Sequence, residues 1–100
     1  MRDHRQHPRK VLNFTVGYQL DGGPRMEAIC RDISLGGMYI EAAASAPFGA
    51  SLNVYLPLPG MHDAAIRATV RWTKPDGMGL QFGVMGARET HALTKLLGTL

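Results

Sequence analysis

Residues 64–82 read AAIRATVRWTKPDGMGLQF, and their pattern decides the class of fold. Apolar residues occupy every second position from Ala64 to Trp72, with arginine, threonine or alanine between them. A repeat of two puts alternate side chains on opposite faces of a β-strand. The run Lys74–Gly77 has the composition of a turn, and Met78–Phe82 then has the character of a returning strand. This stretch therefore predicts a β-hairpin.

Four further strands are expected before it, and turn residues or irregular loops separate them. They are Val11–Leu20, Met26–Ile33, Met38–Glu41 and Leu52–Leu56, the last ended by Pro57 and Pro59. Six short strands without crossover helices predict an all-β, antiparallel fold, and 100 residues favour a closed or split β-barrel over a sandwich. The alternation places Phe14, Tyr18, Trp72 and Phe82 toward the core.

The period changes after Gly83, which predicts one C-terminal amphipathic helix at about residues 87–98. Ala92, Leu93, Leu96, Leu97 and Leu100 recur at steps of three and four, and Gly98 is a plausible stop. The expected organisation is a flexible N-terminal arm, residues 1–10, followed by one barrel domain with its helix, residues 11–100. The apolar stripe of the helix would cover the sheet or an open end of the barrel.

Positive charge is concentrated on the arm. Residues 1–10 carry four bases against one acid, whereas residues 11–100 carry seven of each, so the whole excess of +3 belongs to the arm. A neutral body with a basic arm indicates a local anion site rather than a broad surface for nucleic acid.

Several other functions are disfavoured by composition. No apolar run approaches the roughly 20 residues that span a bilayer, and no secretory signal opens the chain, so we expect no membrane insertion and a cytoplasmic location. Cys30 is expected to be a small buried residue, and the four histidines show no metal-ligand spacing, so no metal or other cofactor is expected. No arrangement of nucleophile and base indicates an enzyme.

Two segments carry candidate binding chemistry. Arg5 and Arg9 place two planar guanidinium forks four residues apart on a segment stiffened by Pro8, and each fork can bind a phosphate or the O6/N7 edge of guanine. Taken alone, this segment is more simply explained as a solvated basic tail.

The second segment is Asp32-Ile33-Ser34-Leu35-Gly36-Gly37. Two residues apart at a strand end, Asp32 and Ser34 are expected to face the same side. The carboxylate can accept hydrogen bonds from the N1–H and N2–H₂ donors of guanine, the hydroxyl can contact base or phosphate, and Gly37 leaves room for a ligand. The alternative is a turn in which these side chains cap local amides.

Together the two segments resemble the PilZ domain family. Its mark is Arg-x-x-x-Arg before the first strand and [Asp/Asn]-x-Ser-x-x-Gly after the second, and this chain has Arg5-x-x-x-Arg9 and Asp32-x-Ser34-x-x-Gly37. Val70–Trp72 and Gly77–Phe82 are similar to the later strands of the family. The resemblance implies a β-barrel with a terminal helix and, as ligand, the bacterial second messenger cyclic di-GMP.

Carried over by position, Arg5, Arg9, Asp32, Ser34 and Gly37 are the expected ligand-binding residues. The expected function is a stand-alone cyclic di-GMP receptor or adaptor whose arm becomes ordered on binding and which signals through an unidentified effector protein. The arm would meet the Asp32–Gly37 segment because the start of the first strand lies beside the end of the second in an antiparallel pair. The alternative is a small β-barrel that binds single-stranded nucleic acid, which the core-facing aromatics disfavour.

Overall fold

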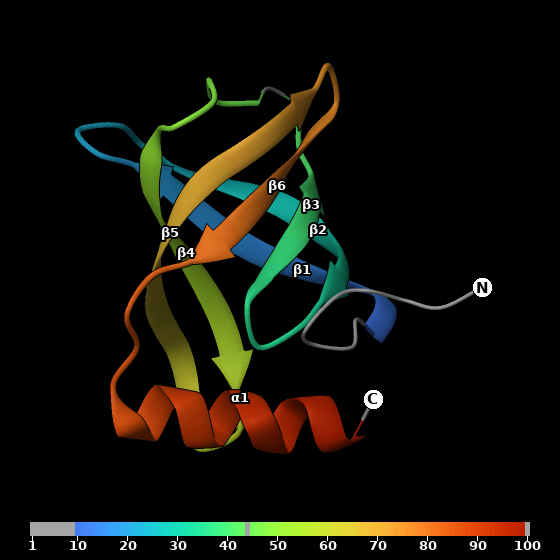
Figure 1. Ribbon diagram of the computed structural model, residues 1–100, viewed down its shortest axis with the longest axis vertical. Coiled ribbons are helices and arrows are strands. Elements are labelled where there is room, and N and C mark those ends of the chain that lie inside the picture. The colour runs from blue at the N-terminus through green and yellow to red at the C-terminus, as the bar shows by residue number, and fades with distance from the viewer. Residues whose placement is uncertain (1–9, 44, 100) are drawn as a thin grey trace.

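The alternating segments form six strands, and a single helix follows them (Figure 1). The computed structural model describes residues 10–43 and 45–99. The elements are β1 (Lys10–Leu20), β2 (Arg25–Ile33), β3 (Gly37–Glu41), β4 (Ser51–Leu58), β5 (Met61–Lys74), β6 (Gly77–Phe82) and α1 (Ala87–Thr99). The predicted six-stranded antiparallel barrel with a C-terminal helix is confirmed.

The strands close in the order β1-β2-β3-β6-β5-β4, with every neighbouring pair antiparallel. Four of the six pairs join strands that are consecutive in the chain. The other two close the barrel: β3 pairs with β6 along its whole length, and β1 pairs with β4 only from Gly17 to Leu20.

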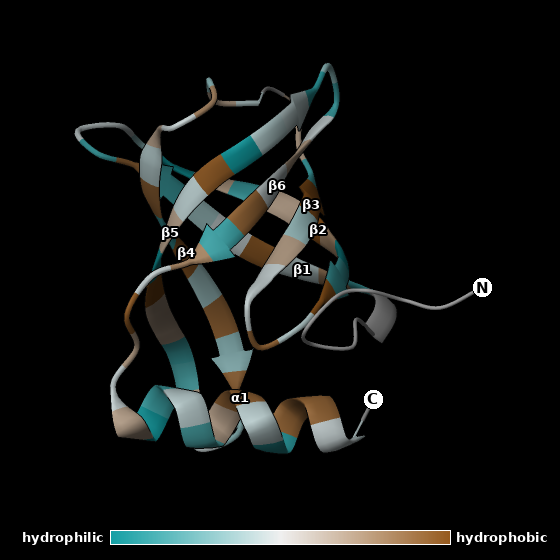
Figure 2. Cartoon of the chain, viewed as in Figure 1, coloured by the Kyte–Doolittle hydropathy of each residue, from teal (hydrophilic) through white to brown (hydrophobic). Residues whose placement is uncertain are grey.

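The inward-facing residues of the strands form one core. The alternation is visible as hydrophobic and hydrophilic bands along the strands (Figure 2). Cys30 is fully buried, as expected, and Tyr18 and Phe82 are also buried. Largest among the fully buried side chains are Ile33, Met38, Ile40, Leu52, Leu56, Ile66, Met78 and Leu93.

Two strands depart from the expected pattern. Trp72 was expected in the core, yet it is 45% exposed, so that prediction is wrong. The cause is a register shift between Val70 and Trp72, which inserts one extra residue into β5 and reverses the alternation beyond it. Pro57 does not end β4, because a second register shift between Leu56 and Leu58 lets the strand continue past the proline.

The helix lies across one end of the barrel, the same end that carries the β2–β3 and β4–β5 turns (Figure 1). Ala92 and Leu93 are buried against the core, and Leu96 and Leu97 pack more peripherally. The helix continues through Gly98, where an expected stop proves to be an ordinary helical position. Among residues 10–43 and 45–99, no helix has the length and apolar character needed to cross a bilayer.

Candidate functional site

The register of the first hairpin joins the two sequence motifs. Lys10 pairs with Ile33 and Val11 pairs with Asp32. The backbone that directly follows Arg9 therefore lies beside the Asp32–Gly37 segment, as expected from the antiparallel pairing. Arg5 and Arg9 themselves lie outside the described residues, so their side-chain positions stay a prediction.

A β-bulge turns Asp32 toward the outer surface. Cys30 and Ile33 are both fully buried, with two residues between them instead of one. A register shift between Cys30 and Asp32 against β3 accounts for this spacing. Without the extra residue, period two would give Asp32 the same inward orientation as Cys30. The half-buried Asp32 instead lies opposite Tyr39 of β3.

Ser34 is used inside the β2–β3 turn. Its side chain is buried, with 3% of the residue exposed. The Ser34 Oγ accepts a hydrogen bond from the Gly36 N–H at 3.1 Å, and the Ser34 N–H donates to the Gly37 carbonyl at 2.8 Å. The expected common face with Asp32 is wrong, because β2 ends at Ile33 and the alternation does not extend to Ser34. The serine shapes the segment that follows Asp32.

The packing of the barrel itself requires glycine at position 37. A Cβ at this position would overlap the carbonyl oxygen of Leu80 and would lie 3.3 Å from the Cα of Gln81. The neighbouring Gly36 carbonyl accepts a hydrogen bond from the Phe82 N–H at 2.9 Å. The close approach that was expected for a ligand is thus made by strand β6, and Gly37 holds the β2–β3 turn against it.

An outward-facing aromatic pair, the half-buried Tyr39 and the exposed Trp72, extends the outer surface beyond Asp32. The two rings are stacked, with centroids 5.1 Å apart and planes 15° from parallel. Tyr39 is paired with Gly79, which in turn is paired with Trp72, so the row Asp32–Tyr39–Gly79–Trp72 crosses four strands. The Lys74 ammonium lies 5.0 Å from the Tyr39 ring centroid.

Two glycines of β6 make room for these rings. A Cβ at Gly79 would overlap the indole of Trp72, and one at Gly77 would overlap the Tyr39 ring, so the two side chains cover the β6 backbone at its glycines. Sequence reasoning missed Trp72 as a surface residue. The available signal was the Gly77-x-Gly79 pair in a strand, which indicates that neighbouring side chains cover the backbone.

The exposed position of Trp72 predicts a small effect on stability. Trp72→Ala is expected to lower the free energy of unfolding by about 1 kcal/mol, the value of an aromatic pair with partial burial. Phe82→Ala, at a buried position, should cost about 3–5 kcal/mol. Urea unfolding of the two variants checks this ranking, and equal losses would contradict the surface role of Trp72.

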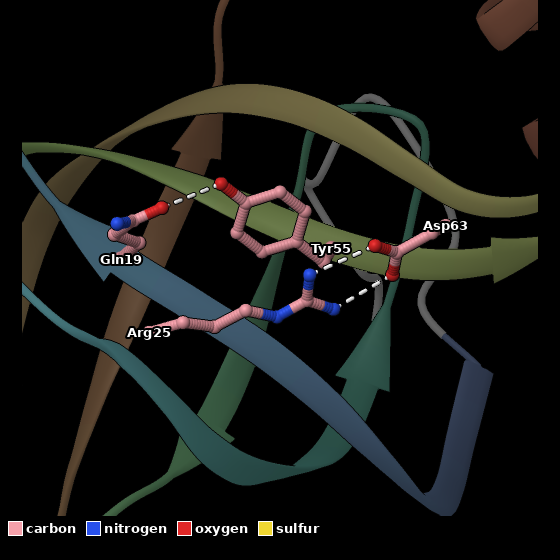
Figure 3. Close-up of polar contacts among 4 residues, drawn as sticks. All are labelled: Gln19, Arg25, Tyr55 and Asp63. Carbon is pink, nitrogen blue, oxygen red and sulfur yellow. Dashed lines mark hydrogen bonds and ion pairs between the residues drawn. The ribbon is translucent and has the colours of Figure 1, made fainter.

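One face of a second aromatic ring, that of Tyr55, is covered by Arg25 (Figure 3). The Arg25 guanidinium lies 3.9 Å from the Tyr55 ring centroid and donates two hydrogen bonds to Asp63, at 2.7 and 2.8 Å. The Tyr55 hydroxyl donates to Gln19 Oε1 at 2.7 Å. The hydrogen bonds from Arg25 lower the pKa of the Asp63 carboxyl. Tyr55 is therefore part of a structural network and offers a less accessible ring face than Trp72.

A hollow of about 350 Å³ on another part of the barrel is a poor anion site. Its lining includes three carboxylates, Glu27, Glu41 and Asp76, which repel phosphate. Within the described part of the chain, no group of His, Cys, Asp or Glu residues could hold a metal ion. The β2–β3 turn and the row Asp32–Tyr39–Gly79–Trp72 beside it therefore form the candidate site.

Comparison with known proteins places this arrangement in context. The family model described as "PilZ domain" matches residues 3–98. No curated protein matches the sequence significantly. Among solved structures, the fold is similar to the PilZ domain of CeSA from a cellulose-synthesizing bacterium, with TM-score 0.73 and 14% identity, covering 89% of this chain and 93% of that one.

Two longer proteins contain a similar unit. The Bacillus subtilis inhibitor of motility MotI/DgrA aligns with TM-score 0.70 and 25% identity over 95% of this chain and 50% of its own. The MrkH–c-di-GMP complex from K. pneumonia aligns with TM-score 0.75 and 15% identity over 96% of this chain and 51% of its own. The chain thus spans about half the length of these two relatives.

Proposed function

This chain belongs to the PilZ domain family, and from that membership we propose that it is a receptor for cyclic di-GMP that signals through a partner protein. One observation carries the proposal: the pairing of Val11 with Asp32, which puts the residues after the Arg5–Arg9 motif next to the Asp32–Gly37 motif. Structures of the relatives MrkH and PlzA contain c-di-GMP. Both motifs on which ligand binding would depend are intact here.

In this proposal the charged groups read the ligand. The Asp32 carboxylate accepts hydrogen bonds from the N1–H and N2–H₂ donors of one guanine, a pair that adenine lacks. The Arg5 and Arg9 guanidinium groups bind the phosphates and a guanine edge from the arm. Charge-assisted hydrogen bonds of this kind contribute about 1.5–3 kcal/mol each.

The remaining motif residues act on the shape of the site. Ser34 holds the turn through the hydrogen bond that its Oγ accepts from the Gly36 N–H, and Gly37 lets the turn pack on β6. Trp72 and Tyr39, in one row with Asp32, supply a flat surface on which a guanine base can stack.

The output of the receptor is proposed to be ordering of the arm, residues 1–10. Ligand phosphates neutralise Arg5 and Arg9 and draw the arm against the barrel next to the β2–β3 turn. An ordered arm changes the surface that a partner protein meets, which is a common basis for switching.

A thermal-shift measurement tests ligand binding directly. At a concentration about a hundredfold above Kd, cyclic di-GMP should stabilise the protein by about 2.7 kcal/mol. For a domain of this size that corresponds to a rise in Tm of roughly 10–20 °C. Cyclic di-AMP is the matched control, since its bases lack the two donors for Asp32. An unchanged Tm with cyclic di-GMP, or equal shifts with both dinucleotides, would contradict the proposal.

The exposed Trp72 also favours a second candidate, binding of single-stranded nucleic acid. The expectation that the aromatics face the core was one reason to set this function aside, and Trp72 departs from it. Stacking on Trp72 next to the cation Lys74 would suit any exposed base. An oligonucleotide that binds tightly with a steep salt dependence, without any response to cyclic di-GMP, would establish this alternative.

A further inference from the structure

A cationic hollow lies between α1 and the β4–β5 turn, and it shares no residue with the candidate site described above. Arg88, His91 and Lys95 line it from the helix, where spacings of three and four residues put them on one face. Pro59, Gly60 and Met61 line it from the turn, and the buried Ala92 completes it. Its volume is about 270 Å³.

The cations of this hollow differ from most other arginines of the barrel. Arg25, Arg31 and Arg67 each form an ion pair with a carboxylate, at 2.7, 2.8 and 2.6 Å. Among the described residues, no carboxylate forms an ion pair with Arg88 or Lys95. The charge of the hollow is therefore not neutralised by the described part of the chain and is available to an external anion.

Helix stability does not explain these residues. Arg88 lies in the first turn of α1, where the helix dipole disfavours a cation by about 0.3–1 kcal/mol. Repeated cations along one face of a helix also repel one another slightly. A carboxylate at position 88 would suit the helix better, so a role outside the helix accounts for the arginine more simply.

The shape and the lining identify the kind of occupant. The volume is below the roughly 300–1,000 Å³ usual for small-molecule sites, which favours a single side chain of a larger partner. Pro59, Met61 and Ala92 contribute apolar surface to the lining, and Arg88 and Lys95 contribute positive charge from the helix. A lipid bilayer is flat and binds protruding apolar side chains, whereas these apolar residues line a hollow.

We propose that this hollow docks an acidic segment of a partner protein, with one apolar side chain of the segment inserted and flanking carboxylates bound by Arg88 and Lys95. Helix α1 and the β4–β5 turn, which line the hollow, lie at the same end of the barrel as the β2–β3 turn (Figure 1), so a partner held here would extend toward the ligand motif. This docking surface would serve the partner protein of the proposed receptor, and docking there requires no bound nucleotide.

Peptide-display selection on the immobilised protein tests the proposal. Selected peptides should carry glutamate or aspartate around an apolar residue. A synthetic, fluorescently labelled peptide of that consensus should bind about tenfold more weakly to Arg88→Glu and to Lys95→Glu. Arg71→Glu is the matched control, since it makes the same change of charge outside the hollow and should leave peptide affinity unchanged.

The variant Arg88→Glu separates docking from folding. Because a carboxylate suits the first turn of the helix, its Tm should equal or exceed that of the wild type while peptide binding is weakened about tenfold. Its affinity for cyclic di-GMP should be unchanged, so a failure of the nucleotide proposal would appear in the wild type and would not imitate a failure here. Selection without acidic enrichment, equal peptide binding by Arg88→Glu, or binding of anionic lipid vesicles in place of the peptide would overturn the inference.

Discussion

Arg9→Ala is expected to lower the affinity for cyclic di-GMP by about ten- to a hundredfold, the largest loss of binding that we predict for a single arginine. The mutation removes one planar fork, and the loss of charge-assisted hydrogen bonds worth about 1.5–3 kcal/mol corresponds to that factor. Arg9 directly precedes Lys10 in the sequence, and Lys10 pairs with Ile33 at the end of β2. Titration calorimetry with wild-type and variant protein measures the difference.

Two control variants separate the effect of the guanidinium geometry of Arg9 from the effect of its positive charge. Arg9→Lys keeps the positive charge but cannot donate two parallel hydrogen bonds, so it should recover only part of the affinity. Arg71→Ala removes a cation from β5 whose guanidinium is hydrogen-bonded to Gln81, and its affinity should match the wild type. If Arg9→Ala binds as tightly as the wild type, the arm does not belong to the site, whatever the barrel itself binds.

Gly37→Ala is expected to cause a large loss of stability, about 3 kcal/mol or more, because overpacking against fixed backbone is costly. The new methyl would overlap the Leu80 carbonyl oxygen, and a strand backbone cannot turn aside as a flexible side chain can. Since a domain of this kind is stable by only about 5–15 kcal/mol, much of its margin would be lost. Urea unfolding followed by circular dichroism measures the change.

Gly98→Ala is the matched control for this substitution. No atom within 4 Å would meet the added methyl, and the residue is helical. Alanine is favoured over glycine in a helix by about 1 kcal/mol, so this variant should be slightly more stable than the wild type. Equal stability of Gly37→Ala and wild type would show that β3 and β6 separate easily at this point.

The periodicity of the sequence was sufficient to predict the six strands, the helix and the barrel. The positions at which it failed are those where the chain leaves simple alternation. A bulge adds one residue without changing composition, so nothing in the run Val70-Arg71-Trp72 shows that the indole faces outward. The bulge before Asp32 is equally silent in the sequence, although there it delivers the carboxylate to the surface as a binding residue requires.

For the motif residues, the pairing of the strand ends could be predicted from the sequence, whereas the roles of Ser34 and Gly37 could not. The pairing of the two strand ends follows from antiparallel geometry, and the register agrees with it as far as Lys10. The roles of Ser34 and Gly37 depend on which neighbour fills the adjacent space, and that neighbour is the turn itself in one case and β6 in the other. Contacts between segments more than forty residues apart, such as Gly37 and Leu80, leave no local pattern to recognise.

The order of the strands has a consequence for how the site comes into existence during folding. The barrel consists of two three-stranded meanders, β1-β2-β3 and β4-β5-β6, each built from contacts that are local in sequence and therefore fast to form. Asp32 and Tyr39 belong to the first meander, and Gly79 and Trp72 to the second. The row is completed only when the seam between β3 and β6 closes, so a half-folded chain would hold Asp32 without the Trp72 surface, and the whole row forms only with this non-local step of assembly.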